Sequence, residues 1–320
     1  MNKSEFFKDK KVLVAGGTGM VGSYLTLELL RRQASVRVMV HERPHTIQDD
    51  KIEYVQGNLR NMDDCLKAVA GSDIVCNSAA ITGGVMLNKS KPADLFTANL
   101  LINTQLLEAA RIKDVDRFLL VSNNSVYSSS ENPSTEDESS KGQPDESVFA
   151  YGWVKRFAEL QAKLFSDQYG LKIAISRGTN SYGRWDKFDP QTSHVIPALI
   201  LKTVRKENPF VVWGSGRNVR DFIHANDLAR AMLLMLERHA ICVPINIGTG
   251  KYVTINDLVT LIMKILNHDA KIVLDDKQPD GQLVKIMNIS KSQDLLEFKP
   301  KIGLEKGLKD TIDWYMRTLS

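Results

Sequence analysis

The sequence predicts an α/β protein with a doubly wound parallel sheet and a smaller C-terminal lobe of mixed α/β structure. Short apolar strands alternate with amphipathic helices from Lys11 to Arg177, and a glycine-rich turn directly follows the first strand. After Arg177 the alternation becomes irregular and turns interrupt it. Strands that alternate with helices favour a parallel sheet that helices cover on both faces.

The individual elements follow from the apolar runs. Strands are expected at residues 11–16, 34–40, 52–58, 72–80, 117–123 and 171–177. Helices are expected from the glycine turn to about residue 32, around 63–71, from about 92 to 112, and from 149 onward. A helix at 224–237 and a strand at 244–250 look like a return to the sheet. We therefore expect one lobe from residues 1–177 plus about 218–248, and a second from 178–217 plus 249–320.

The composition is that of an ordinary globular chain, with 43% hydrophobic and 25% charged residues among 320. The net charge of +4 is spread without basic blocks, so neither a nucleic-acid arm nor a polybasic membrane patch is expected. No apolar run approaches the ~20 residues of a membrane span, and the N-terminus lacks a signal-peptide core. The three cysteines have no metal or redox spacing. We expect a cytoplasmic protein without a metal site.

One segment breaks the pattern. Residues 128–147 are polar, rich in serine and proline, and largely acidic. This composition indicates a solvated loop. Because the segment lies between two elements that we expect to line a site, a lid or rim over that site is the alternative.

The glycine turn predicts a dinucleotide site. Gly16, Gly19 and Gly22 have the spacing G-x-x-G-x-x-G between the first strand and the first helix. Glycine permits the tight turn and a close backbone approach to a diphosphate, which the helix N-terminus attracts. The predicted contacts in this turn are Gly16, Thr18, Gly19, Met20, Val21 and Gly22. The first lobe is thus expected to be the cofactor-binding domain of a Rossmann fold.

The end of the second strand bears on the choice of cofactor. No acid stands at the strand end to bond the ribose of NAD; His41, Glu42 and Arg43 follow it, and Arg43 could meet a 2′-phosphate. We expect NADP(H) rather than NAD(H), the alternative being that these residues are loop surface. Asn58 and Leu59, after the third strand, are expected at the adenine, and the small Ala79 and Ala80 leave room for the cofactor across the fourth strand.

Tyr151 and Lys155 lie four residues apart on one face of a predicted helix. They could be an ordinary surface pair. Alternatively, the lysine lowers the pKa of the phenol, which is ordinarily near ~10, so that the phenol can exchange a proton.

Several of these motifs together resemble a known family. The glycine turn, the Y-x-x-x-K pair and residues 220–231 resemble the extended short-chain dehydrogenases/reductases, the NAD-dependent epimerase/dehydratase family, which act on nucleotide-activated sugars. Within that family, four stretches are similar to the GDP-L-fucose synthases, at residues 79–99, 179–200, 211–222 and 279–291. The resemblance implies an oxidoreductase or epimerase that works at C4 of a nucleotide sugar, in particular a GDP-sugar. The second lobe would then bind the sugar nucleotide.

The resemblance also implies residue roles. Tyr151 would donate and accept the proton, and Lys155 would bind the nicotinamide ribose and lower the Tyr151 pKa together with the nicotinamide charge. His194 would be an acid/base for epimerisation. The positions that match family contacts to the GDP-sugar are Asn180, Val195, Lys202, Trp213, Arg220 and Lys285.

Two positions depart from the family pattern. Asn123 stands where the family has Ser or Thr, and an amide cannot relay a proton as a hydroxyl can. Ser122 should face the other side of the strand, which leaves Ser125 as the better substitute. Ser125 itself stands where GDP-L-fucose synthases have an epimerising cysteine, and a serine without a partner is a poor base. The redox half of the reaction survives these changes, whereas epimerisation at C3 and C5 is in doubt.

Three outcomes at the site therefore stay open. The first is reduction of a 4-keto-6-deoxy sugar, or oxidation of a C4 hydroxyl. The second is a 4-epimerase that retains its NAD, and the third is a dinucleotide-binding regulatory protein that has lost activity. In each case a homodimer is expected, because the helices at 92–112 and around Tyr151 carry apolar residues beyond the need of one sheet face. These residues include Leu100, Leu101, Leu106, Leu107, Phe157, Leu160 and Leu164.

Overall fold

The centre of the molecule is a parallel sheet. The computed structural model describes residues 5–83, 85–190, 192–277 and 281–319. Within these residues the main sheet has seven strands in the order β10-β6-β5-β4-β1-β2-β3, and all neighbours are parallel. The strands are β1 (Lys11–Ala15), β2 (Ser35–Val40), β3 (Ile52–Gln56), β4 (Ile74–Asn77), β5 (Arg117–Asn123), β6 (Lys172–Gly178) and β10 (Pro244–Ile247). The predicted fold class is confirmed.

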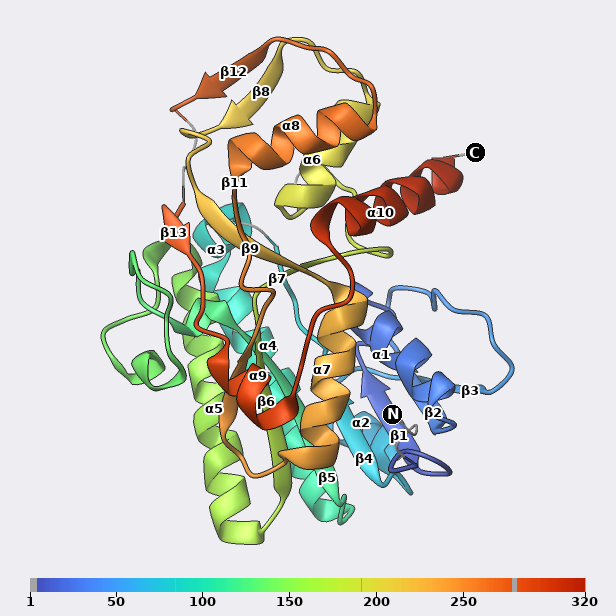
Figure 1. The fold of residues 1–320 in the computed structure, drawn as a ribbon. Coiled ribbons are helices and arrows are strands. Elements are labelled where there is room, and N and C mark those ends of the chain that lie inside the picture. Colours follow the sequence, from blue (N-terminus) through green and yellow to red (C-terminus); the bar gives the residue numbers. More distant parts are fainter. Residues whose placement is uncertain (1–4, 84, 191, 278–280, 320) are drawn as a thin grey trace.

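Helices cover both faces of this sheet (Figure 1). On one face lie α1 (Met20–Arg31) and α7 (Ala225–Arg238), and on the other α2 (Met62–Val69), α4 (Pro92–Ile112) and α5 (Phe149–Tyr169). After Lys11, every residue of β1 is apolar because both faces of the strand are buried. Val12 and Val14 belong to the core under α1 and α7, whereas Leu13 and Ala15 belong to the core under α2, α4 and α5. Alternate side chains of a strand point to opposite faces, so a strand buried on both faces reads as a continuous apolar run.

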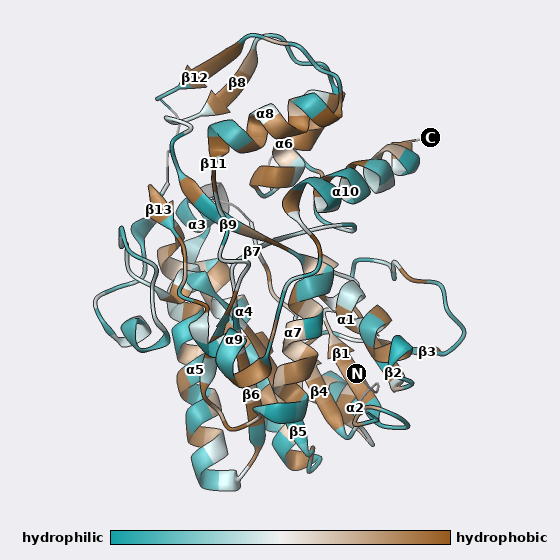
Figure 2. Ribbon diagram, viewed as in Figure 1, coloured by the Kyte–Doolittle hydropathy of each residue, from teal (hydrophilic) through white to brown (hydrophobic). Residues whose placement is uncertain are grey.

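The smaller lobe lies beyond the carboxyl ends of the main strands (Figure 1). Its sheet has the order β11-β9-β13, with β7 also paired to β9, and a separate ribbon joins β8 to β12. The strands are β7 (Asn180–Tyr182), β8 (Phe210–Trp213), β9 (Val219–His224), β11 (Tyr252–Thr254), β12 (Ile272–Asp275) and β13 (Val284–Lys285). Helices α6 (Val195–Val204), α8 (Ile255–Ile265) and α10 (Leu304–Leu319) pack around a third apolar core, and much of α6 and α8 is brown in Figure 2.

The chain passes repeatedly between the two lobes. Strand β9 lies in the smaller sheet, whereas α7, which follows it directly, and then β10 return to the main sheet. Helix α9 (Ser290–Leu296) packs on α7 and β10, and α10 belongs to the smaller lobe again. Residues 218–248, which were assigned to the first lobe, therefore include a strand, β9, that pairs within the second lobe. The division into a cofactor-binding and a sugar-binding domain stays a prediction.

The polar segment 128–147 is partly built into the fold. Ser134 and Glu136 are buried, and Ser134 forms a bridge with Met287. The Glu136 carboxylate accepts a hydrogen bond from the Asn246 backbone at 2.9 Å. The segment thus holds β10 and the C-terminal part of the chain together, which a purely solvated loop would not do.

Candidate active site

A cavity of about 740 Å³ opens where the carboxyl ends of the main strands meet the smaller lobe. Its lining comes from the β1–α1 turn, the segments after β2, β3, β4 and β5, helix α5, and the start of α6. Crevices at this edge of a doubly wound sheet are the usual place of ligand binding. The predicted cofactor residues all line it: Gly16, Thr18, Gly19, Met20, Val21, Gly22, His41, Arg43, Asn58, Leu59, Ala79, Ala80, Tyr151 and Lys155.

The glycine turn has the geometry of a phosphate cradle. Gly16 has a φ of +77°, and a Cβ there would lie 2.6 Å from the backbone nitrogen of Ala79. A Cβ on Gly22 would lie 2.1 Å from the carbonyl oxygen of Gly16, so only glycine lets α1 approach the turn this closely. Gly19 precedes the first turn of α1, where backbone N–H groups lack partners within the helix. These residues fit the diphosphate of a dinucleotide.

Two arginines line the cavity in the segments that follow β2 and β3. The Arg43 guanidinium donates to the carbonyl oxygen of Trp185 at 2.9 Å. Arg60, which sequence analysis missed, also lines the cavity and donates to the Asn58 side-chain oxygen at 3.2 Å. The Glu42 side chain points largely into solvent. The sequence did offer a signal for Arg60, because this basic residue directly follows Asn58 and Leu59, which were predicted to contact the adenine.

Tyr151 and Lys155 lie together on α5 and border the cavity. The Lys155 Nζ is 5.3 Å from the centroid of the Tyr151 ring and donates to the Val121 carbonyl oxygen at 2.7 Å. Burial lowers the pKa of Lys155 to about 8, although the nearby Glu159 carboxylate opposes this shift. Burial also raises the pKa of Tyr151 above its ordinary value. This direction is opposite to the lowering that the family resemblance implied for the Tyr151–Lys155 pair and the nicotinamide charge together.

The side chains of Ser122, Asn123 and Ser125, at the end of β5, have three different environments. The Ser122 hydroxyl donates to the buried Glu159 carboxylate, away from the catalytic cluster, as expected for the other face of the strand. The Asn123 side-chain oxygen accepts the Ser125 backbone N–H at 3.0 Å and so caps the short turn after β5. The Ser125 side chain faces the cavity, is only 4% exposed, and its Oγ lies 3.3 Å from the Lys285 Nζ on β13.

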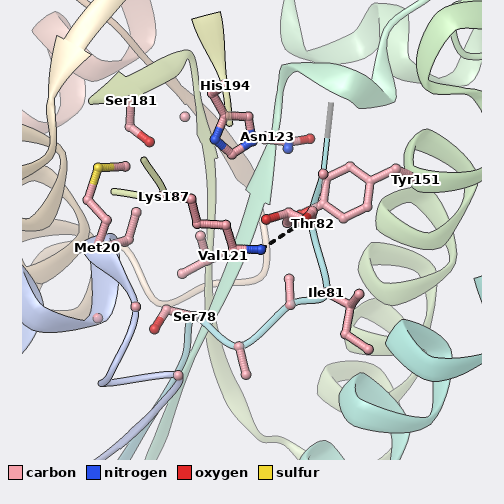
Figure 3. A pocket seen from close by; sticks show the side chains of 18 of the residues that line it. Met20, Ser78, Ile81, Thr82, Val121, Asn123, Tyr151, Ser181, Lys187 and His194 are labelled. Carbon is pink, nitrogen blue, oxygen red and sulfur yellow. Dashed lines mark hydrogen bonds between the residues drawn. The ribbon is translucent and has the colours of Figure 1, made fainter. Parts of the chain in front are cut away.

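His194 lies at the start of α6, and its side chain is 45% exposed. Its Nδ1 is 3.6 Å from a carboxylate oxygen of the buried Asp186. Figure 3 shows His194, Asn123 and Tyr151 around the same cavity. The structure thus brings together the five residues predicted to be catalytic.

The predicted sugar-nucleotide residues fall into two groups. Asn180, Val195 and Lys285 line the cavity, whereas Lys202, Trp213 and Arg220 lie outside its lining. Lys202 donates to the Val211 carbonyl oxygen at 2.6 Å, and its Nζ lies 6.0 Å from the ring of Trp213, which is 49% exposed. Arg220 donates to the Gln282 carbonyl oxygen at 2.5 Å. Lys202 and Trp213 thus lie together on the smaller lobe, whereas Arg220 lies on β9, where its charge acts on Lys285.

Lys187 is a further cavity residue that sequence analysis missed. Its Nζ donates to the Thr82 carbonyl oxygen at 3.0 Å, so its side chain links the segment after β7 to the segment after β4 (Figure 3). No local pattern marks this residue, because its partner is 105 positions away. The described part of 128–147 does not line the cavity, which counts against a lid.

Other classes of site find no support in the described residues. They include no group of His, Cys, Asp and Glu side chains that could hold a metal ion. Burial raises the pKa of the Cys65 and Cys76 thiols to about 12, so neither is a reactive thiolate near neutral pH. None of the helices among these residues is long and apolar enough to cross a membrane.

The parallel sheet, the glycine cradle and the Tyr151–Lys155 pair define a Rossmann protein built to bind a nicotinamide dinucleotide. A sequence profile of the NAD dependent epimerase/dehydratase family matches residues 12–248. The chain belongs to this family, whose members are nicotinamide-dependent enzymes that include nucleotide-sugar epimerases and reductases.

Curated relatives extend the similarity over nearly the whole chain. The chain is 31% identical to a probable GDP-L-fucose synthase 1 of Oryza sativa subsp. japonica, covering 99% of this chain and 95% of that one. It is 30% identical to the GDP-L-fucose synthase of Escherichia coli K12, covering 96% and 97%. A dTDP-4-dehydro-6-deoxy-D-allose reductase of Streptomyces bikiniensis is 28% identical over 96% of each chain.

The same fold occurs in solved structures of proteins that are named for other nucleotide sugars. The UDP-glucose 4-epimerase of Thermotoga maritima superposes with a TM-score of 0.88 at 25% identity, covering 97% of this chain and 100% of that one. The family is thus shared by proteins named for GDP-, dTDP- and UDP-sugars.

Proposed function

We propose that the protein is an NADPH-dependent enzyme that reduces the C4 ketone of a GDP-linked 4-keto-6-deoxy sugar. The observation that carries this proposal is the convergence of Tyr151, Lys155, Ser125 and His194 on one cavity that also holds the glycine cradle. The relatives named GDP-L-fucose synthase, at 30–31% identity, support the nucleotide and the reaction.

The chain's own residues would supply the proton chemistry. When bound, the nicotinamide supplies the hydride for the ketone carbon. Tyr151 gives its phenolic proton to the ketone oxygen, and a raised pKa keeps that proton in place at neutral pH. The phenolate that remains is stabilised by the Lys155 ammonium, 5.3 Å from the ring. With a pKa of about 8, Lys155 is still mostly charged at neutral pH.

The preference for NADP(H) over NAD(H) is proposed from the side chains that line the cavity after β2 and β3. Arg43 and Arg60 border the cavity there. Glu42 borders it too, but its side chain is largely exposed, so water screens its repulsion of a 2′-phosphate. Guanidinium groups bind phosphate oxygens through paired hydrogen bonds. This arrangement favours NADP(H) over NAD(H).

The nucleotide is proposed to reach toward the smaller lobe. Lys202 carries positive charge beside Trp213, an exposed ring on which a base can stack, and the Arg220 charge lies on β9 near Lys285. Asn180, Val195 and Lys285 would then border the sugar, between this surface and Tyr151.

Incubation with GDP-4-keto-6-deoxymannose and NADPH tests the proposal. We expect NADPH oxidation, read by absorbance, and a reduced deoxysugar product, read by NMR and mass spectrometry. A protein that binds NADPH but neither oxidises it with this sugar or the dTDP- and UDP-linked counterparts, nor interconverts C4 epimers, would instead be a dinucleotide-binding regulatory protein.

A nucleotide-sugar 4-epimerase is the second candidate, favoured by the similarity to the UDP-glucose 4-epimerase structure. Such an enzyme returns the hydride to the same sugar and needs no added cofactor. NAD that stays bound through purification, with interconversion of C4 epimers in its presence, would favour this candidate over the reductase.

A further inference from the structure

Ser125 has a partner that its position in the sequence does not reveal. Ser125 follows β5, and Lys285 lies on β13, 160 residues later. The Lys285 Nζ lies 3.3 Å from the Ser125 Oγ, and both side chains line the cavity that contains Tyr151. A lone serine is a poor base, but a serine beside an amine can pass its proton on.

The surroundings of Lys285 favour its neutral form. Burial lowers its pKa to about 8, and the positive charge of Arg220 on the neighbouring strand β9 adds to this shift. The Asp145 carboxylate, on the loop before α5, opposes the shift. A substantial part of the amine is therefore neutral in mildly alkaline solution, whereas an ordinary lysine would be protonated almost completely.

We propose that Ser125 and Lys285 act as a proton-accepting pair that removes a hydrogen from the sugar carbon next to the C4 ketone. This inference rests on the proposed function, because only the ketone makes that hydrogen acidic. Ser125 is the group that would touch the sugar, and Lys285 acts through it. The pair takes the place of the cysteine that GDP-L-fucose synthases were expected to have here, and so restores a route to epimerisation.

The step balances without an oxidant or a reductant. The carbon–hydrogen bond breaks and its proton passes to the Ser125 oxygen, while the Ser125 hydroxyl proton passes to the neutral Lys285 amine. The electron pair left on carbon forms the enolate, whose oxygen accepts a hydrogen bond from the Tyr151 phenol. Return of a proton to the same carbon reverses the step, and return from His194 would invert the centre if His194 stands on the opposite side of the sugar.

The competing role for Lys285 is simply to neutralise the diphosphate, and Lys285→Arg separates the two. Arginine keeps the positive charge but cannot be deprotonated in this pH range. The assay is deuterium uptake at C3 and C5 of GDP-4-keto-6-deoxymannose in D₂O without NADPH, followed by NMR. For the natural protein we expect uptake to rise with pH and level off above about 8, the pKa of Lys285.

Both substitutions should then remove that uptake. Lys285→Arg should abolish the pH-dependent exchange while the sugar nucleotide still binds, and Ser125→Ala, which removes one oxygen, should slow exchange about 10²–10⁴-fold. Lys271→Arg, at an exposed lysine before β12, is the matched control and should change nothing. Binding of NADPH to each variant establishes that it is folded.

NADPH oxidation in a parallel sample separates failure of this inference from failure of the proposed function. Reduction of the sugar without exchange at C3 or C5 overturns the Ser125–Lys285 pair and leaves the reductase standing. Exchange that survives Lys285→Arg with an unchanged pH profile also overturns the pair. Absence of both reduction and exchange overturns the proposed function, and this inference with it.

Discussion

At the scale of single residues, the pKa of Tyr151 shows what helical spacing alone cannot predict. The Tyr151 pKa was expected to be lowered by Lys155 and the nicotinamide charge together. Burial among the protein's own residues raises this pKa, and the Lys155 ammonium donates to the Val121 carbonyl oxygen. Helical spacing shows that two side chains share a face, but it does not report how much water remains around them. The protonated phenol suits the direction of ketone reduction, in which it must give a proton.

Tyr151→Phe tests this role. The ring and its packing remain and only the hydroxyl is lost, so NADPH should bind almost as before while ketone reduction falls about 10²–10⁴-fold. Single-turnover NADPH oxidation and a fluorescence titration of NADPH measure the two effects. Equal reduction rates in both proteins would show that the proton comes from elsewhere.

Arg43→Ala tests the cofactor preference. A charge-assisted contact with a 2′-phosphate contributes roughly 1.5–3 kcal/mol, so the variant should lose affinity for NADP(H) and keep it for NAD(H). Arg43 also bonds the Trp185 carbonyl, so the NAD(H) titration is the control for local disorder. Equal losses for the two cofactors would make Arg43 a structural residue, and Arg60→Ala would then be the next variant.

At the scale of elements, the βα alternation and the presence of a smaller mixed lobe could be predicted, whereas the helices and strand pairings inside that lobe could not. The helix at Pro92–Ile112 and the strand at Arg117–Asn123 were predicted with the bounds that the structure shows. Helix α6 was not predicted, because residues 195–204 are apolar almost throughout and have no helical periodicity to detect. The pairing of β13 with β9 joins segments about 65 residues apart, and local pattern cannot report it. For the same reason the contact of Lys285 with Ser125 required the structure.

The glycine turn gives a prediction at this scale. Gly22→Ala places a Cβ 2.1 Å from the Gly16 carbonyl oxygen, so α1 must move away from β1. We expect a loss of about 1–3 kcal/mol in the free energy of unfolding, together with much weaker NADPH binding. Gly303→Ala is the matched control, since a Cβ there meets nothing within 4 Å. Urea unfolding and NADPH titration of both variants measure this, and equal behaviour would mean that the turn tolerates a side chain.

At the scale of the whole molecule, the apolar surface left for a dimer contact is smaller than expected. Leu106 and Leu107 were counted as surplus apolar residues, but both belong to the core between α4, α5 and the sheet. Phe157, Leu160 and Leu164 on α5 remain, with 43%, 55% and 56% of their surfaces exposed. They form an apolar strip along one helix, which a second copy of the chain could cover.

We predict a homodimer through this strip. Light scattering at micromolar concentration should give twice the monomer mass, and Leu160→Glu combined with Leu164→Glu should halve it without loss of folded structure by circular dichroism. A monomeric mass for the natural protein would rule the dimer out.

The repeated passage of the chain between the lobes has a consequence for how such a protein can change over generations. A fragment ending at Arg177 would lack α7 and β10, whose side chains fill the core beneath α1. No single cut in the gene therefore yields a complete cofactor lobe, and end-to-end fusion of residues 1–177 to a foreign sugar-binding lobe would leave this core incomplete. A new sugar specificity is then expected to arise by substitution within the existing chain, at positions such as Val195 that border the cavity outside the main sheet.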